Sequence, residues 1–298
     1  MVEYIKVEDP ILILGYDWER YGKENLPEEE QRKQQEIGIK GLEIVCRVHT
    51  SLKKPFTLFI LGKMLERPNI LSAILNQLKS PDLKKYIDIE QHAYSHVEFK
   101  KLPGRTPLTL EQIEWEVKYT KELIREKLGV DVIGIRPPQG HYKGLQGEHK
   151  ILKILYDNGI RFISSDLRNK EEKFPSSWYD EEGNIRQPYL YDKNRYPDLI
   201  EIPTQGWNDN ALKGMSRTTK IRKHTLEEEV EIHKENIDFA VDNILCYAPL
   251  FHPWATAMTD EQGFVWTEII KYADKKGVKI MSYKGVYYYL LDIIKGRR

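Results

Sequence analysis

Cysteine is the residue that this sequence uses least. Only Cys46 and Cys246 are present among 298 residues, and they lie far apart along the chain. Two separated cysteines exclude a disulfide framework and a cysteine-rich zinc module. Such scarcity is typical of proteins in a reducing compartment, so we expect a cytoplasmic location.

The chain also lacks an excess of charge of either sign and lacks long hydrophobic runs. Its 46 Lys and Arg residues balance 46 Asp and Glu residues. This balance argues against binding of nucleic acid or of a membrane surface through bulk charge. The apolar run from Ile11 to Leu14 is far too short to span a bilayer or to form the core of a signal peptide. We therefore expect no nucleic-acid partner and no membrane span.

With 40% hydrophobic and 31% charged residues, the chain has the composition of a soluble globular protein. The length suits one domain of α/β-barrel size or two ordinary domains. No internal repeat, low-complexity tract or Gly/Ser linker divides the chain. We therefore predict a single domain over residues 1–298, with an irregular insertion at about 167–198.

Short apolar runs with the residue types of buried parallel strands recur along the chain, and segments with helix signals separate most of them. This alternation predicts right-handed βαβ units, and about seven to eight parallel strands favour an α/β barrel similar to a TIM barrel. The eight runs are Ile11–Gly15, Phe56–Leu61, Ile87–Glu90, Val132–Ile135, Arg161–Ser164, Leu199–Ile202, Ile244–Phe251 and Val278–Ser282.

Three threonines have the spacing of a helix capping box. They predict that helices begin just after them. The pairs are Thr109 with Gln112, Thr225 with Glu228, and Thr259 with Gln262.

Ionisable side chains follow the predicted strand ends, where parallel barrels gather their catalytic groups. Two histidines spaced four residues apart can face the same way and hold one metal ion. A carboxylate would complete a three-ligand site with an open position. The pair also fits two half-exposed residues on a turn, but nearby acids favour the metal. The residues concerned are His92 and His96 with Glu90, Asp17 and Glu19.

An arginine directly follows the fourth apolar run, in Arg136-Pro-Pro-Gln-Gly. The segment fits a rigid turn, because proline restricts φ and glycine permits a left-handed bend. A guanidinium at the end of a hydrophobic strand also needs a carboxylate partner, and Asp17 is the candidate. His252, which follows the apolar run ending at Phe251, taken alone fits a satisfied core histidine.

Taken together, these motifs resemble the polysaccharide deacetylase family, the NodB-like carbohydrate esterases, across most of the chain. Their order along the chain matches the order in that family. The matching segments are Tyr16-Asp17-Trp18-Glu19, Thr57 to Gly62, His92-Ala93-Tyr94-Ser95-His96, Arg136-Pro137-Pro138-Gln139-Gly140 and Leu250-Phe251-His252-Pro253.

The resemblance implies a distorted (β/α) barrel and a metal-dependent hydrolase that removes an N-acetyl group from an amino sugar or glycan derivative. It makes Asp17 the base, Arg136 the residue that orients the base, and His252 the acid. His92 and His96 would hold one divalent cation. Zinc is the expected metal, and cobalt or nickel also fits because soft ligands are absent.

The third metal ligand stays open between two acids. Trp18 stands where many family members have a second, metal-binding Asp. Glu19 can take that role, as in relatives with an acid two residues after the base. In the rival assignment Asp17 is the ligand and Glu19 is a surface acid. The Asp-Trp motif that tunes the acid histidine in the family is not found, and Asp166 lies near the expected region without a following Trp.

The substrate is expected to be a small molecule or an oligosaccharide, and a homo-oligomer is compatible with the sequence. Flat aromatic faces suit sugar rings, so Trp178 and Trp207 are candidate substrate-binding residues, with packing on the barrel as the alternative. An allantoinase-like hydrolase of a small non-peptide amide uses the same fold and is the alternative function. A non-catalytic glycan-binding barrel would require lost catalytic residues, whereas Asp17, Arg136 and His252 are intact.

Overall fold

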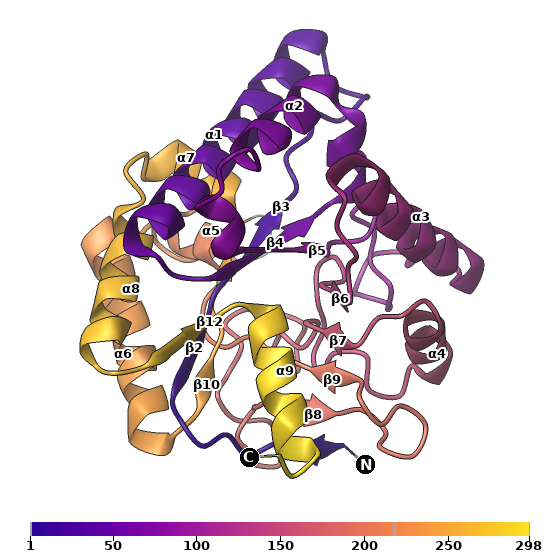
Figure 1. The fold of residues 1–298 in the computed structure, drawn as a ribbon, viewed down its shortest axis with the longest axis vertical. Coiled ribbons are helices and arrows are strands. Elements are labelled where there is room, and N and C mark those ends of the chain that lie inside the picture. The colour runs from indigo at the N-terminus through magenta and orange to yellow at the C-terminus, as the bar shows by residue number, and fades with distance from the viewer. Residues whose placement is uncertain (1, 217–218, 298) are drawn as a thin grey trace.

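A nine-stranded, mostly parallel sheet curls through the computed structural model, which describes residues 2–216 and 219–297 (Figure 1). The strand order is β1-β8-β9-β7-β6-β5-β4-β3-β11, and only β1 and β8 pair antiparallel with their neighbours. The strands are β1 (Glu3–Tyr4), β3 (Gly15–Trp18), β4 (Phe56–Ile60), β5 (Ile87–Gln91), β6 (Gly134–Ile135), β7 (Phe162–Ile163), β8 (Tyr189–Leu190), β9 (Ile200–Glu201) and β11 (Leu250–Phe251).

A second, three-stranded parallel sheet has the order β10-β2-β12. Its strands are β2 (Ile11–Ile13), β10 (Cys246–Tyr247) and β12 (Lys279–Met281). The first and seventh predicted runs each supply a strand to both sheets. In the seventh run the break falls at Ala248 and Pro249, because proline has no N–H for the ladder and the Ala248 N–H donates instead to Gln205 Oε1 at 3.0 Å.

The prediction of an α/β fold with a mostly parallel, curled sheet is confirmed, and every one of the eight predicted runs contains a strand. The curl differs from a closed TIM barrel. Among the described residues, the nine-stranded sheet ends in the antiparallel pair β1 and β8, and no strand pairing joins this edge to the other edge at β11. The result is a half-barrel, because antiparallel edge strands replace the pairing that would close it.

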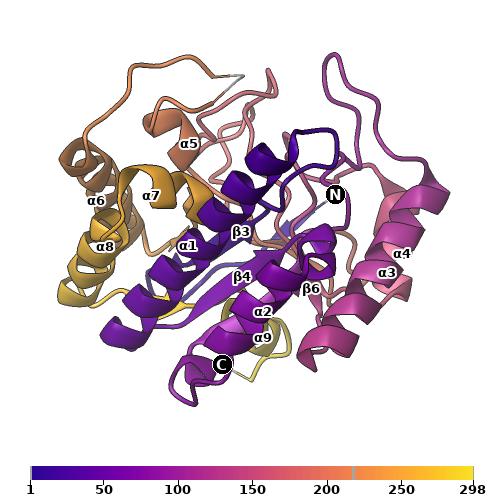
Figure 2. The same ribbon diagram turned by 90° about the horizontal axis from the view of Figure 1, so that it is seen from above.

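Helices surround the curled sheet, as Figures 1 and 2 show from two directions. Residues 167–198 add only the short β8 to the regular structure. The helices are α1 (Glu28–Leu52), α2 (Pro68–Gln77), α3 (Leu110–Leu128), α4 (His149–Asp157), α5 (Asp209–Leu212), α6 (Leu226–Asn243), α7 (Pro253–Thr259), α8 (Phe264–Lys275) and α9 (Tyr283–Ile294), with the 3-10 turns η1 (Gly62–Glu66) and η2 (Leu83–Lys85). No helix of the described ranges is long and apolar enough to cross a membrane.

Two of the three predicted capping boxes are confirmed, at Thr109 for α3 and Thr225 for α6. The third prediction was wrong, because Thr259 is the last residue of α7. Asp260 takes over the next helix start: its carboxylate accepts from the N–H groups of Phe264 and Val265, both at 2.9 Å. The aspartate side chain thus satisfies unpaired N–H groups in the first turn of α8, which begins a few residues later than the threonine predicted.

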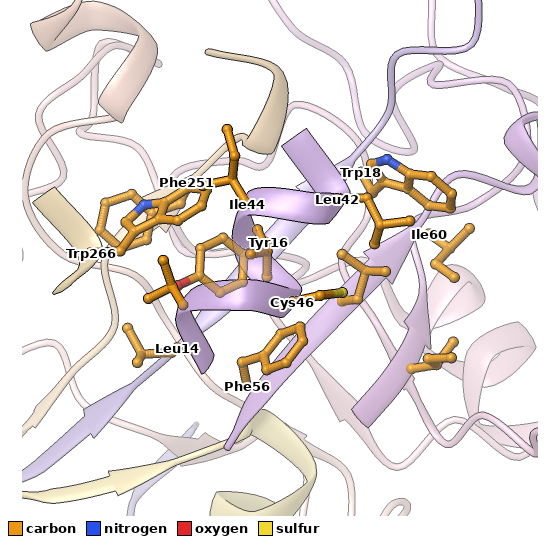
Figure 3. Packing of buried hydrophobic residues seen from close by; sticks show 14 of the residues in the cluster. Leu14, Tyr16, Trp18, Leu42, Ile44, Cys46, Phe56, Ile60, Phe251 and Trp266 are labelled. Carbon is orange, nitrogen blue, oxygen red and sulfur yellow. The ribbon is translucent and has the colours of Figure 1, made fainter. Parts of the chain in front are cut away.

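The core between α1 and the sheet orients strand β3 (Figure 3). Tyr16 and Trp18 point to α1, where the Tyr16 hydroxyl lies 2.8 Å from His49 Nε2 and the Trp18 indole N–H donates to the Gly38 carbonyl at 2.8 Å. Burying each large side chain contributes about 1.5–3 kcal/mol. Because neighbouring side chains on a strand point to opposite faces, Asp17 is directed to the interior of the half-barrel.

Gly15 lets the tyrosine that begins α9 approach the strand that carries Asp17. A Cβ atom on Gly15 would lie 2.5 Å from a ring carbon of Tyr283 and 3.0 Å from one of Phe59. We predict that Gly15→Ala lowers the free energy of unfolding by about 1–3 kcal/mol, the range for overpacking a core. Urea denaturation at equilibrium measures this change.

Gly285→Ala is the matched control for this prediction, because Gly285 lies inside α9 and its added Cβ would come no nearer than 3.1 Å to any neighbour. Alanine is preferred to glycine in a helix, so we expect a change smaller than about 1 kcal/mol. Equal stability of Gly15→Ala and the wild type would contradict the close packing described above.

Candidate active site

An ion pair between Arg136 and Asp17 lies at the centre of the site. Arg136 directly follows β6 and is 1% exposed, and its NH1 lies 2.7 Å from Asp17 Oδ1 on β3. The NH2 group donates to the Tyr283 hydroxyl at 2.6 Å, and Nε donates to Ser164 Oγ at 3.3 Å. The guanidinium also lies 4.3 Å from the ring centre of Phe59. Each of the three guanidinium nitrogens therefore has a hydrogen-bond partner, as burial of a charge requires.

Glu19, His92 and His96 form a cluster that can hold a metal ion. Their ligand atoms all lie within 4.8 Å of one another. Glu19 Oε2 is 2.7 Å from His96 Nε2 and 3.5 Å from His92 Nε2. Asp17 Oδ2 is farther from His92 Nε2, at 3.9 Å. Two imidazoles and one carboxylate are the donor set of many catalytic zinc sites.

The backbone determines which ring nitrogen of His92 faces this cluster. His92 Nδ1 lies 2.6 Å from the carbonyl oxygen of Arg136, and a carbonyl accepts only, so Nδ1 carries the proton. The buried Nε2 has no hydrogen-bond partner and keeps its lone pair. A hydrogen bond of this kind to the remote nitrogen is what orients metal-binding histidines. Gln139 contacts the second histidine, with Nε2 3.4 Å from His96 Nδ1.

Glu19 is held by Trp254, which lies two residues after His252. The Trp254 indole N–H donates to Glu19 Oε1 at 3.0 Å, which leaves Oε2 toward the two imidazoles. The Arg20 guanidinium lies over the ring of Trp254, 3.9 Å from the ring centre. Burial alone would raise the pKa of Glu19. The charge of His96 and the hydrogen bond from its Nε2 to Glu19 outweigh burial and hold the pKa of Glu19 well below its usual range.

His252 pairs with Asp209, a residue that the sequence analysis missed. Both oxygens of the fully buried Asp209 are used: Oδ1 lies 2.6 Å from His252 Nδ1, and Oδ2 accepts the His252 backbone N–H at 2.8 Å. Asp166, the aspartate considered for this role, instead accepts from the Lys143 N–H and lies 3.6 Å from Arg186. The available signal was Asp209 itself, which closely follows Trp207 in the loop after the sixth predicted run.

The surroundings of His252 favour its charged form. Burial alone would lower the pKa of His252. The charge of Asp209, the hydrogen bond to it, and the charges of Glu19 and Asp17 outweigh burial and raise this pKa to about 9. The imidazole is therefore protonated at neutral pH. Because Nδ1–H donates to Asp209, the proton available for transfer is the one on Nε2.

The two candidate substrate tryptophans have different surroundings. Trp178 packs on α6: its indole N–H donates to Asn236 at 2.8 Å and its ring lies 4.8 Å from the ring of Phe239. Trp207 is partly buried, packs against the cluster that contains Leu250, and lies two residues before Asp209. The structure therefore gives Trp178 a packing environment on α6, whereas Trp207 packs near Leu250, the residue two positions before His252.

Comparison with known families gives a match to the polysaccharide deacetylase family over residues 43–163. This segment contains the His92-to-His96 motif and Arg136. The resemblance that the motifs predicted is thereby confirmed. No curated protein matches the chain.

Solved structures with related folds cover nearly the whole chain. A candidate polysaccharide deacetylase from Mycobacterium smegmatis has a TM-score of 0.69 at 15% identity, covering 96% of this chain and 93% of that one. The allantoinase Puue has a TM-score of 0.64 at 12% identity, covering 96% and 90%. A candidate polysaccharide deacetylase from Pseudomonas aeruginosa has a TM-score of 0.63 at 11% identity, covering 92% and 87%. At these identities the similarity shows the fold alone.

The pairing with Asp209 predicts how His252 titrates. In protein treated with EDTA, we expect NMR to give a midpoint near pH 9, with the charged form lost as the pH rises through that value. Asp209→Asn removes the raising charge but not the burial, so the midpoint should fall toward the ordinary value of about 6.5.

Asp166→Asn is the control for this titration, because Asp166 hydrogen-bonds the Lys143 N–H rather than His252. Its His252 midpoint should stay near that of the wild type. A midpoint that is the same in Asp209→Asn and the wild type would show that Asp209 does not set the charge of His252.

Proposed function

We propose that the protein is a metal-dependent hydrolase that removes the N-acetyl group from an amino sugar or a glycan derivative. The observation that carries this proposal is the cluster of Glu19, His92 and His96 beside the Asp17–Arg136 pair. This arrangement, with His252 nearby, supports a cation site, a carboxylate base and an acid in one interior. These are the groups that metal-assisted hydrolysis of an amide needs.

The ligand set fits a divalent cation on the evidence of the histidine geometry. The unpartnered Nε2 of His92 offers a lone pair, and Glu19 Oε2 faces both imidazoles. We propose that His92, His96 and Glu19 hold one cation, with zinc as the expected metal and cobalt or nickel also compatible. When bound, the cation would polarise the amide carbonyl and the attacking water.

The proposed roles of the protein groups follow from their hydrogen bonds. Arg136 binds Asp17 Oδ1, so Oδ2 is left to accept the proton of the attacking water. His252 donates its Nε2 proton to the leaving amine nitrogen, and Asp209 stabilises the charged imidazole that makes this donation possible. The base and the acid are therefore separate residues with opposite charges.

The distances to the imidazoles favour Glu19 over Asp17 as the third metal ligand. Glu19 lies nearer to both imidazoles, and Trp254 directs its second oxygen toward them. Asp17 is engaged by the buried arginine. An allantoinase-like reaction without a metal remains the alternative, and the clustered ligands favour the metal-dependent reaction. Acetate release from a panel of N-acetyl sugars, with allantoin as the comparison substrate, tests the choice.

Metal analysis of single variants tests the two acids. The wild type should hold one divalent cation per chain, and the double variant His92→Ala/His96→Ala should hold none. Glu19→Gln should lose the metal because the carboxylate ligand is removed. Asp17→Asn should keep the metal and lose turnover by a factor of about a hundred or more, the scale of a missing general base.

Elemental analysis and acetate release on the same preparations measure both properties. A metal-free Asp17→Asn protein beside an active, metal-replete Glu19→Gln protein would reverse the assignment. A wild type that is active without any metal would favour the allantoinase-like alternative.

The tryptophans give a second prediction for substrate binding. We propose that Trp207 lies along the substrate site, so Trp207→Ala should raise KM for an N-acetyl sugar more than it changes the unfolding midpoint. Trp178→Ala should chiefly lower stability, because its ring packs against Phe239. Steady-state kinetics and urea denaturation of both variants measure this, and an unchanged KM in Trp207→Ala would remove it from the site.

A further inference from the structure

Glu116 is a buried carboxylate of helix α3, 3% exposed, that binds the loop between the two candidate metal-binding histidines. Its Oε2 accepts the backbone N–H of Tyr94 at 3.0 Å and that of Ser95 at 3.2 Å. Its Oε1 accepts a hydrogen bond from the Ser95 hydroxyl. One side chain thus satisfies three donors in the middle of the His92-to-His96 segment.

The loop needs such a constraint because its backbone is unusual on both sides of Glu116's contacts. Ala93 has φ 57° and His96 has φ 65°, both in the left-handed region. Non-glycine residues stay in this region only when their surroundings over-determine the conformation. The neighbouring turn η1 adds two contacts, as Gly62 N–H donates to the Ala93 carbonyl at 2.8 Å and Lys63 N–H to the Tyr94 carbonyl at 3.3 Å.

We propose that Glu116 is a positioning residue that fixes the loop conformation in which His92 and His96 face Glu19. The proposal rests on the metal-dependent function proposed above. His92 is also held by its bond to the Arg136 carbonyl, whereas His96 is 25% exposed on its side chain and follows the two residues that Glu116 binds. His96 is therefore the ligand whose position depends most on Glu116.

Two substitutions at Glu116 distinguish the effect of its hydrogen bonds on the loop from the effect of its negative charge. Glu116→Ala removes both acceptor oxygens and with them all three hydrogen bonds. Glu116→Gln can keep them occupied, because its carbonyl oxygen accepts the two backbone N–H groups and its amide donates to the Ser95 hydroxyl, which can accept as well as donate. We expect Glu116→Ala to weaken Co²⁺ binding by about 10–100-fold, the range for outer-shell partners of metal ligands, and Glu116→Gln to restore it to near the wild type.

The measurements are titration of the metal-free protein with Co²⁺, followed by its visible absorption, and hydrogen exchange of the metal-free protein. Exchange should rise selectively at the Tyr94 and Ser95 amides in Glu116→Ala. Ile124→Ala is the matched control, because Ile124 is fully buried on the same helix and packs in another part of the core. It should lower the unfolding midpoint without changing Co²⁺ affinity.

Each outcome decides the proposal. Wild-type Co²⁺ affinity and wild-type protection of Tyr94 and Ser95 in Glu116→Ala would overturn it, as would an equal loss of affinity in Ile124→Ala. A wild type that binds no Co²⁺ would overturn the metal centre itself. Hydrogen exchange would then still decide whether Glu116 fixes the loop.

Discussion

The buried charge of Arg136 is the constraint on which the site depends. A guanidinium removed from water needs a carboxylate and further acceptors, and it is strongly destabilising when a partner is lost. Asp17, Ser164 and Tyr283 supply these partners from β3, from the end of β7 and from α9. The carbonyl of the same arginine fixes the tautomer of His92. Arg136 thus joins the candidate base Asp17, the candidate metal ligand His92 and helix α9.

Three acids around this centre have different partners, and each partner defines what the acid can do. Asp17 faces an arginine, so its charge is compensated and one oxygen is left available. Glu19 faces two imidazoles and a tryptophan N–H, which suits a metal ligand. Both oxygens of Asp209 bind His252, and the charge of Asp209 keeps that imidazole charged. Environment, rather than residue type, separates the candidate base, the candidate metal ligand and the partner that stabilises the charge of His252.

Much of the site was predictable because its residues directly follow strands. Parallel strands that end at Trp18, Gln91 and Ile135 bring the residues at and just after their ends to the same end of the sheet. The spacing of four residues then predicts that the two histidines lie close together. Asp209 was missed because its distance from His252 is 43 residues along the chain and depends on the path of an irregular loop. No local pattern encodes that path. The third helix cap failed for a different, local reason: Thr259 is the last residue of α7, and its hydroxyl donates to the Ala255 carbonyl.

The amino-acid sequence by itself determined the strand runs, two of the helix starts, the α/β class and the family resemblance, because each depends on residues that are close together along the chain. Only the tertiary structure decided that the sheet stops as a half-barrel, that Trp178 packs on α6 and that Glu116 binds the histidine loop. These features depend on which distant segments meet. That outcome is set by how the whole core packs and by the need to pair every buried polar group, neither of which a local pattern records.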